Sequence, residues 1–274
     1  KTYKIYIDGK FPRTESGRVY LLKNLIGEPI ANICRGSRKD LRDSIVSNRK
    51  AQSGWAKRSA YNKGQILYRI AETLEGRKAQ FVESFIRQGL LPAAAIQETE
   101  AAIDLLVYYA GWCDKYIQVF SSVNPVESSH FNFSYHEPMG VLTVIAPEES
   151  GLLGMVAAIA PMIIGGNAIT VLASEKYPMT AIDFAEVLHA SDVPGGVVNI
   201  ITGYRKEFLS HAASHMDVNG IVYSDLTAEQ RKLVQTNAAG NVKRVVDFSK
   251  EEMATPYRIL SGQEVKTTWH PIGS

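Results

Sequence analysis

The second half of the chain alternates short apolar segments with helical patterns, and this alternation restricts the possible fold more than any other feature. Continuous apolar strands joined by helices are typical of a parallel sheet that is covered on both faces. Right-handed crossovers then predict an α/β fold, a Rossmann-like domain with five parallel strands. The predicted strands are 141–146, 168–173, 197–201, 221–224 and 242–248, and the predicted helices between them are 152–164, 179–190, 207–214 and 227–238.

The first half is predicted to be a strand-rich entry followed by a wrap of helices. Tyr3, Ile5 and Ile7 alternate with polar residues before a turn at Asp8-Gly9, and a second extended segment is expected at 19–22. Apolar residues at helical spacing follow. Ser37 and Asp40 form a capping-box pattern, and the longest helix is expected to run from Pro92 to Ile117.

Two further segments read as exposed strands. Residues 130–137 alternate, with Phe131, Phe133 and Tyr135 on one face, and a last extended segment covers 264–269. We therefore expect a body formed by residues 1–120 and 138–252, with 121–137 and 253–274 forming a small β element of their own.

Composition and charge exclude several classes of protein. Apolar residues make up 45% and charged residues 21% of the 274, as in ordinary globular domains. A net charge of +2 gives no electrostatic footprint for nucleic acid. Two cysteines exclude a disulfide scaffold and suit a reducing compartment, so a cytoplasmic location is expected.

One uncharged stretch, residues 151–173, is long enough to span a bilayer. Pro161 and the turn residues 165–167 interrupt it in the middle, so two buried elements joined by a turn explain it better. No membrane partner is expected. The first ten residues also lack the apolar core of a targeting segment, and the missing Met leaves the native start open.

Several motifs together resemble the aldehyde dehydrogenase superfamily. They cover nearly the whole chain, and the closest likeness is to the degenerate second module of family 16 aldehyde dehydrogenases. The 264–267 segment resembles the C-terminal oligomerisation strand of that family. The motifs are Tyr6-Ile7-Asp8-Gly9, Pro138-Met139-Gly140-Val141, Ala160-Pro161, Gly166-Asn167, the run 194–200 with Gly203, and Ala213-Ser214-His215.

The resemblance implies that the catalytic residues of the family are missing. Glu149 stands where the family has an asparagine that stabilises an oxyanion, and Phe248 stands at the general-base position. No cysteine follows Cys113, so the family's nucleophile has no counterpart. The catalytic domain is expected to be deleted, with the sheet joined directly to the tail, and no catalytic residue is assigned.

The cofactor positions are also altered. Leu172 replaces a lysine that contacts the cofactor ribose, whereas Glu175 matches a retained ribose-contacting glutamate. Arg205 and Leu209 replace glycines near the cofactor, and Asp225 places a negative charge where a diphosphate would lie. Glu175 is the one candidate cofactor-binding residue, and it could equally cap a helix. We expect no cofactor, with NAD as the alternative.

Three further features allow a functional and a structural interpretation. Cys113 could be a substitute nucleophile, but a buried thiol of the core is favoured. His211 and His215 have the spacing of metal ligands on a helix, but they fit the family pattern without a metal, so none is expected. Glu148 and Glu149 could form an acid/base pair, against a default of two solvated carboxylates.

These observations predict a pseudoenzyme that acts as an assembly or scaffold subunit. Loss of the catalytic domain would expose apolar surface and strand edges, which proteins normally cover. We therefore expect a homo-oligomer, or a hetero-oligomer with a catalytic aldehyde dehydrogenase. The alternative is a residual oxidoreductase or nucleotide sensor that binds NAD through Glu175.

Overall fold

A five-stranded, all-parallel sheet forms the centre of the molecule in the computed structural model, which describes residues 1–273. The strand order is β10-β9-β6-β7-β8, so the sheet grows from β6 first in one direction and then in the other. The α/β class and all five predicted strands are confirmed. The strands are β6 (Val141–Ile145), β7 (Ala168–Leu172), β8 (Val198–Ile201), β9 (Gly220–Tyr223) and β10 (Arg244–Asp247).

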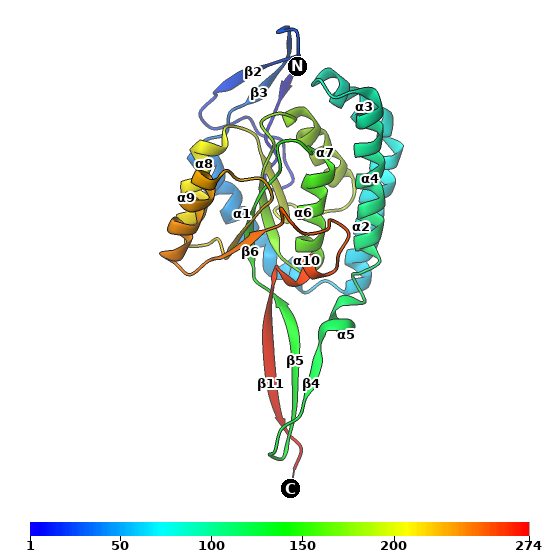
Figure 1. The fold of residues 1–274 in the computed structure, drawn as a ribbon, viewed down its shortest axis with the longest axis vertical. Coiled ribbons are helices and arrows are strands. Elements are labelled where there is room, and N and C mark those ends of the chain that lie inside the picture. The colour runs from blue at the N-terminus through cyan, green and yellow to red at the C-terminus, as the bar shows by residue number, and fades with distance from the viewer. Residues whose placement is uncertain (274) are drawn as a thin grey trace.

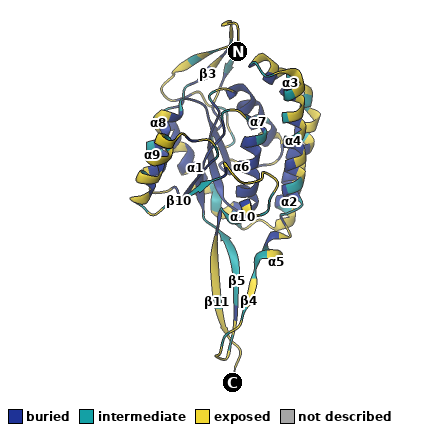
Figure 2. Ribbon diagram, viewed as in Figure 1, coloured by how far each residue is buried: buried dark blue, intermediate teal, exposed yellow. Residues whose placement is uncertain are grey.

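Helices cover both faces of this sheet (Figure 1). One layer consists of α6 (Leu153–Ile164) and α7 (Pro178–Ala190). The opposite layer consists of α1 (Arg38–Ala56), α8 (Arg205–Ser214) and α9 (Ala228–Ala239). Side chains of β6 pack alternately against the two layers, which is why apolar residues fill all of its positions except Thr143. Figure 2 shows this central layer as the most deeply buried part of the chain.

The predicted helical wrap lies outside α6 and α7. It consists of α2 (Ala60–Gly76), α3 (Lys78–Arg87), α4 (Pro92–Ala110) and the short α5 (Tyr116–Phe120). The predicted single helix over 92–117 is wrong. The chain leaves α4 at Gly111 and turns before α5, and two apolar residues of α4, Ile96 and Val107, are 41% and 44% exposed.

A small sheet at the N-terminus lies next to β8. It contains β1 (Thr2–Tyr3), β2 (Val19–Lys23) and β3 (Pro29–Cys34), in the order β1-β3-β2. The predicted turn is confirmed, because Asp8 and Gly9 both have positive φ angles and Ile7 pairs with Lys10 across them. β3 was not expected, since its polar and apolar residues alternate only in part.

A three-stranded sheet projects from the body and contains the last strand of the chain (Figure 1). It is formed by β4 (Ser122–Asn124), β5 (His130–Pro138) and β11 (Gln263–Pro271), and we call it the arm. Strands β5 and β11 pair in antiparallel orientation, which agrees with the predicted β element. β4 was not among the expected strands. Helix α10 (Tyr257–Leu260) leads into β11, and the predicted segment 253–274 ends outside the described residues.

The uncharged stretch 151–173 is divided as the sequence predicted, into α6 and β7 with a turn at 165–167. Residues 1–273 contain no helix whose length and apolarity would let it cross a membrane.

Candidate functional site

The order of the strands places one topological switch point in the sheet, at the carboxyl ends of β6 and β9. The chain leaves β6 towards β7 and β8, then returns to build β9 on the other side of β6. Open α/β sheets bind ligands in the crevice at such a point. Ala146 follows β6 there, and Asp225 follows β9.

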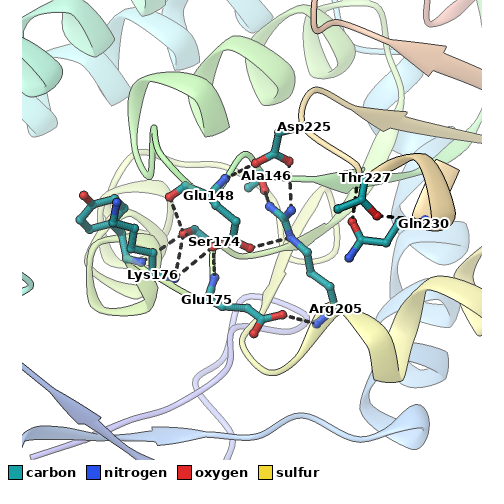
Figure 3. Close-up of polar contacts among 10 residues, drawn as sticks. Ala146, Glu148, Ser174, Glu175, Lys176, Arg205, Asp225, Thr227 and Gln230 are labelled. Carbon is teal, nitrogen blue, oxygen red and sulfur yellow. Dashed lines mark hydrogen bonds and ion pairs between the residues drawn. The ribbon is translucent and has the colours of Figure 1, made fainter.

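The side chain of Arg205, the first residue of α8, fills this crevice (Figure 3). Its side chain is 5% exposed, with Nη1 3.0 Å from Asp225 Oδ1 and Nε 2.7 Å from Glu148 Oε1. Nη2 also donates to the carbonyl of Ala146. One guanidinium therefore joins the ends of β6 and β9. The family resemblance implied a glycine at this position.

Glu148 is held from the opposite side by the loop that follows β7. Its Oε2 accepts hydrogen bonds from Ser174 Oγ at 2.9 Å, Glu175 N at 2.8 Å and Lys176 N at 3.1 Å. Its own N–H donates to Asp225 at 2.5 Å. The interpretation of Glu148 as a solvated carboxylate is therefore wrong. Its neighbour Glu149 has a side chain that is 78% exposed and pairs with Lys176.

Glu175 contacts the beginning of α8. Its Oε1 accepts a hydrogen bond from the backbone N–H of Arg205 at 2.8 Å (Figure 3). A carboxylate in this position satisfies an unpaired N–H and interacts favourably with the helix dipole. Helix N-termini also bind the phosphates of dinucleotides, so Glu175 occupies an anion position of α8 with its own charge. Its role toward a ribose stays a prediction.

A second carboxylate caps α6 in the same manner. Glu98 of α4 accepts from the N–H groups of Leu152 and Leu153 at 3.2 and 3.0 Å, and from Ser150 Oγ at 2.8 Å. The sequence analysis did not identify Glu98. It lies in the interior of a helix far along the chain, and no local pattern marks it as a cap for another element.

The residues at this edge of the sheet do not fit a dinucleotide. A guanidinium fills the switch point, and the chain's own carboxylates cap α6 and α8. Leu172, at the position of a ribose-contacting lysine, is 2% exposed and offers no polar atom. Leu209, at the second altered glycine position, is buried against α1 and the sheet.

Neither the general-base position nor the two cysteines offer a reactive group. Phe248 is buried, and its ring lies 4.2 Å from the guanidinium of Arg258. Both cysteines are buried thiols without a disulfide partner. Burial raises the pKa of Cys113 to about 12, so its thiol stays protonated at neutral pH. The interpretation of Cys113 as a buried thiol of the core is confirmed.

We expect both thiols to resist modification in the folded protein. Because the nucleophile is the thiolate, a raised pKa and burial both slow the reaction of Cys113, and Cys34 is 1% exposed. Titration with a chromogenic disulfide at pH 8 should release no chromophore until denaturant is added, and should then count two thiols. Rapid release from the folded chain would contradict this interpretation.

His211 and His215 lie at the end of α8 and just after it. Desolvation lowers the pKa of both imidazoles. Among residues 1–273, no group of three or more His, Cys, Asp and Glu side chains is arranged to hold a metal ion.

Comparison with known proteins shows which family the chain resembles. The model of the aldehyde dehydrogenase family matches residues 13–247. The chain is 30% identical to omega-crystallin of Enteroctopus dofleini over 250 residues, which is 89% of this chain and 50% of that protein. It is 32% identical to retinal dehydrogenase 2 of Mus musculus over 253 residues, 89% of this chain and 48% of that protein. The chain thus spans about half the length of these relatives.

Solved structures show the same fold. A mutant of the aldehyde dehydrogenase from Bacillus cereus superimposes with a TM-score of 0.86 at 21% identity, covering 90% of this chain and 50% of that one. The NAD+ complex of the aldehyde dehydrogenase from Bacillus cereus superimposes with a TM-score of 0.85, also at 21% identity and with the same coverage.

Proposed function

The chain belongs to the aldehyde dehydrogenase family, and on that premise we propose that it is a non-catalytic assembly subunit that does not use NAD. The observation that carries the proposal is the position of Arg205. Its guanidinium joins the carboxyl ends of β6 and β9, where a ligand of an open α/β sheet would enter. An enzyme of this kind needs that crevice for its cofactor.

We expect no NAD binding and no aldehyde turnover. Binding would have to break the contacts of Arg205 with Glu148 and Asp225 and would bring a diphosphate close to both carboxylates. NAD is the ligand to test, since one of the similar structures is described as an NAD+ complex. Isothermal titration with NAD at millimolar concentration should give no heat, and aldehydes should produce no NADH.

The alternative, a nucleotide sensor or residual enzyme, makes the opposite prediction. It requires measurable NAD binding that Glu175→Ala weakens. Lys23→Ala, which removes an exposed side chain of β2, serves as the control that should change nothing. Saturable heat that depends on Glu175 and not on Lys23 would overturn the proposal for the cofactor site.

The arm is the surface that we assign to assembly. Its three strands are paired only with one another, and β11 leaves one edge without a strand partner among residues 1–273. Large apolar side chains are exposed on it. Phe131 is 44%, Trp269 58% and Val265 64% exposed. Unpaired strand edges and apolar patches of this kind are normally covered in proteins.

We expect the protein to form an oligomer through the arm, or to join a catalytic aldehyde dehydrogenase by it. Sedimentation velocity should give a mass above that of one chain, and Phe131→Asp with Trp269→Asp should return it to the monomer. Tyr61→Asp is the matched control, because Tyr61 is a 74% exposed aromatic residue on α2. A stable monomer that binds no dehydrogenase from its source cells would contradict the assembly role.

A further inference from the structure

A groove of about 640 Å³ lies between the beginnings of α1 and α8, and Glu15 and Arg18, which precede β2, form a third wall. It is on the opposite side of α8 from the switch point. Residues two positions apart on an α-helix point about 200° from each other. Arg205 fills the switch point, so Glu207, which lines the groove, faces away from it. Among residues 1–273, none that follows β6 or β9 lines this groove.

The groove lies in the most cationic part of the chain. Residues 1–50 contain twelve lysines and arginines but five acids, a net charge of +7, although the whole chain carries only +2. Arg38 and Lys39 bring part of this charge to the groove from α1, and Lys206 adds another cation from α8. A concave surface with an excess of one sign of charge attracts ligands of the opposite sign.

Two of these cations, Arg38 and Lys206, have no carboxylate partner. No acid within residues 1–273 forms an ion pair with either side chain, and both are exposed. The charge of Arg38 reaches α8, where it adds to desolvation in lowering the pKa of His211. The other charged side chains of the groove are paired with each other, Lys39 with Glu15 at 3.1 Å and Arg18 with Glu207 at 3.7 Å.

A buried carboxylate holds one wall of the groove in place. Asp40 is 5% exposed, and its side chain accepts from Thr14 Oγ1 at 2.5 Å, Glu15 N at 3.0 Å and Ser37 N at 2.7 Å. These contacts fix the turn before β2 against the first turn of α1. Because Asp40 and Ser37 already form a capping box there, the N-terminus of α1 has its own anion. The attraction for a ligand therefore comes from the exposed cationic side chains.

We propose that this groove binds a compact polyphosphate, a small molecule with two or more phosphate groups, at Arg38 and Lys206. Since Glu15 and Glu207 also line the groove, a ligand must carry its negative charge in concentrated form. A terminal phosphate carries about −1.5 to −2 at neutral pH, more than a carboxylate, and a guanidinium binds its oxygens in a bidentate manner. The site does not depend on whether the chain assembles or lacks NAD.

Inorganic triphosphate is the probe, titrated calorimetrically into the full chain without magnesium at an ionic strength of about 0.1 M. We expect a Kd of about 1 mM or tighter, and binding of monophosphate that is about threefold or more weaker, because it reaches only one of the two cations. NAD should give no saturable heat here, since each of its two phosphates is a diester with a single charge.

Three outcomes of these titrations would overturn the proposal. The first is the absence of triphosphate binding. The second is hexaglutamate that binds more tightly than triphosphate, which would assign the groove to an acidic protein segment. The third is heat from NAD that Arg38→Gln removes, whereas heat from NAD that depends on Glu175 would contradict only the proposed function.

Variants locate the ligand in the groove. Arg38→Gln and Lys206→Gln should each weaken triphosphate binding by about threefold, and together by about tenfold. Lys50→Gln is the matched control, because it removes the same charge from an exposed position of α1. Lys50 lies about 18 Å along the helix from Arg38, beyond the screening length of about 10 Å, so this variant should change the Kd by less than about 1.5-fold. Equal effects of Lys50→Gln and Arg38→Gln would show attraction to the cationic surface as a whole and refute the site.

Discussion

Replacing Arg205 with methionine is expected to lower the free energy of unfolding by about 3 kcal/mol. This value is at the lower end of the range for removing one partner of a buried ion pair. The methionine retains most of the apolar volume but leaves Glu148 and Asp225 facing each other without a cation. Their side chains are 26% and 30% exposed, so water relieves part of the repulsion. The carbonyl of Ala146 loses its donor as well. Urea unfolding measures the difference.

The control for this substitution is Arg42→Met, which breaks an ion pair with Asp43 between side chains that are 59% and 48% exposed. It should cost about 0.5 kcal/mol or less. Adding Glu148→Gln and Asp225→Asn to Arg205→Met should restore much of the loss, because the unpaired charges then disappear. If Arg205→Met costs no more than Arg42→Met, the guanidinium does not bind the two strand ends together.

The fold could be predicted where burial dictates the sequence. Residues of β6 to β9 are buried on both faces, so apolar residues fill most positions of each strand and mark it in the sequence. The sequence did not predict β3 and β4, because these strands are short or partly exposed and contain no continuous apolar segment. The end of α4 was missed for a related reason. The apolar spacing continues through Cys113 to Ile117, although the backbone turns at Gly111.

The site could be predicted only at positions where one residue replaces another in a known motif. This holds for the altered positions Leu172, Asp225 and Phe248. The contacts of Arg205 could not, because they join residues that lie 20 and 59 positions apart in the chain. Glu98 is separated from Leu152 by 54 positions. A sequence pattern gives no orientation for such a side chain, and the fold alone decides which helix end each carboxylate caps.

Asn167→Leu is expected to destabilise the protein by about 4 kcal/mol, because three buried hydrogen bonds of about 1 kcal/mol each are lost and one donor is left unsatisfied at a cost of about 1 kcal/mol or more. Asn167 is fully buried in the turn between α6 and β7. Its Oδ1 accepts from Gly140 N at 2.9 Å, and its Nδ2 donates to Met162 O at 3.0 Å and Gly262 O at 2.9 Å. Leucine has the same branching but bulkier methyl groups, and it can replace none of these contacts. Chemical unfolding gives the change in stability.

The same substitution should also loosen the arm, because Gly262 immediately precedes β11. Gln263 donates to the carbonyl of Gly165, so the turn after α6 holds the beginning of the tail strand at two places. Hydrogen exchange of the β11 amides should therefore accelerate more than the exchange of β7. Asn237→Leu on α9 is the control, since its side chain contacts only the preceding turn of its own helix. A loss of stability as small as that of Asn237→Leu, with unchanged exchange in β11, would show that Asn167 does not anchor the arm to the sheet.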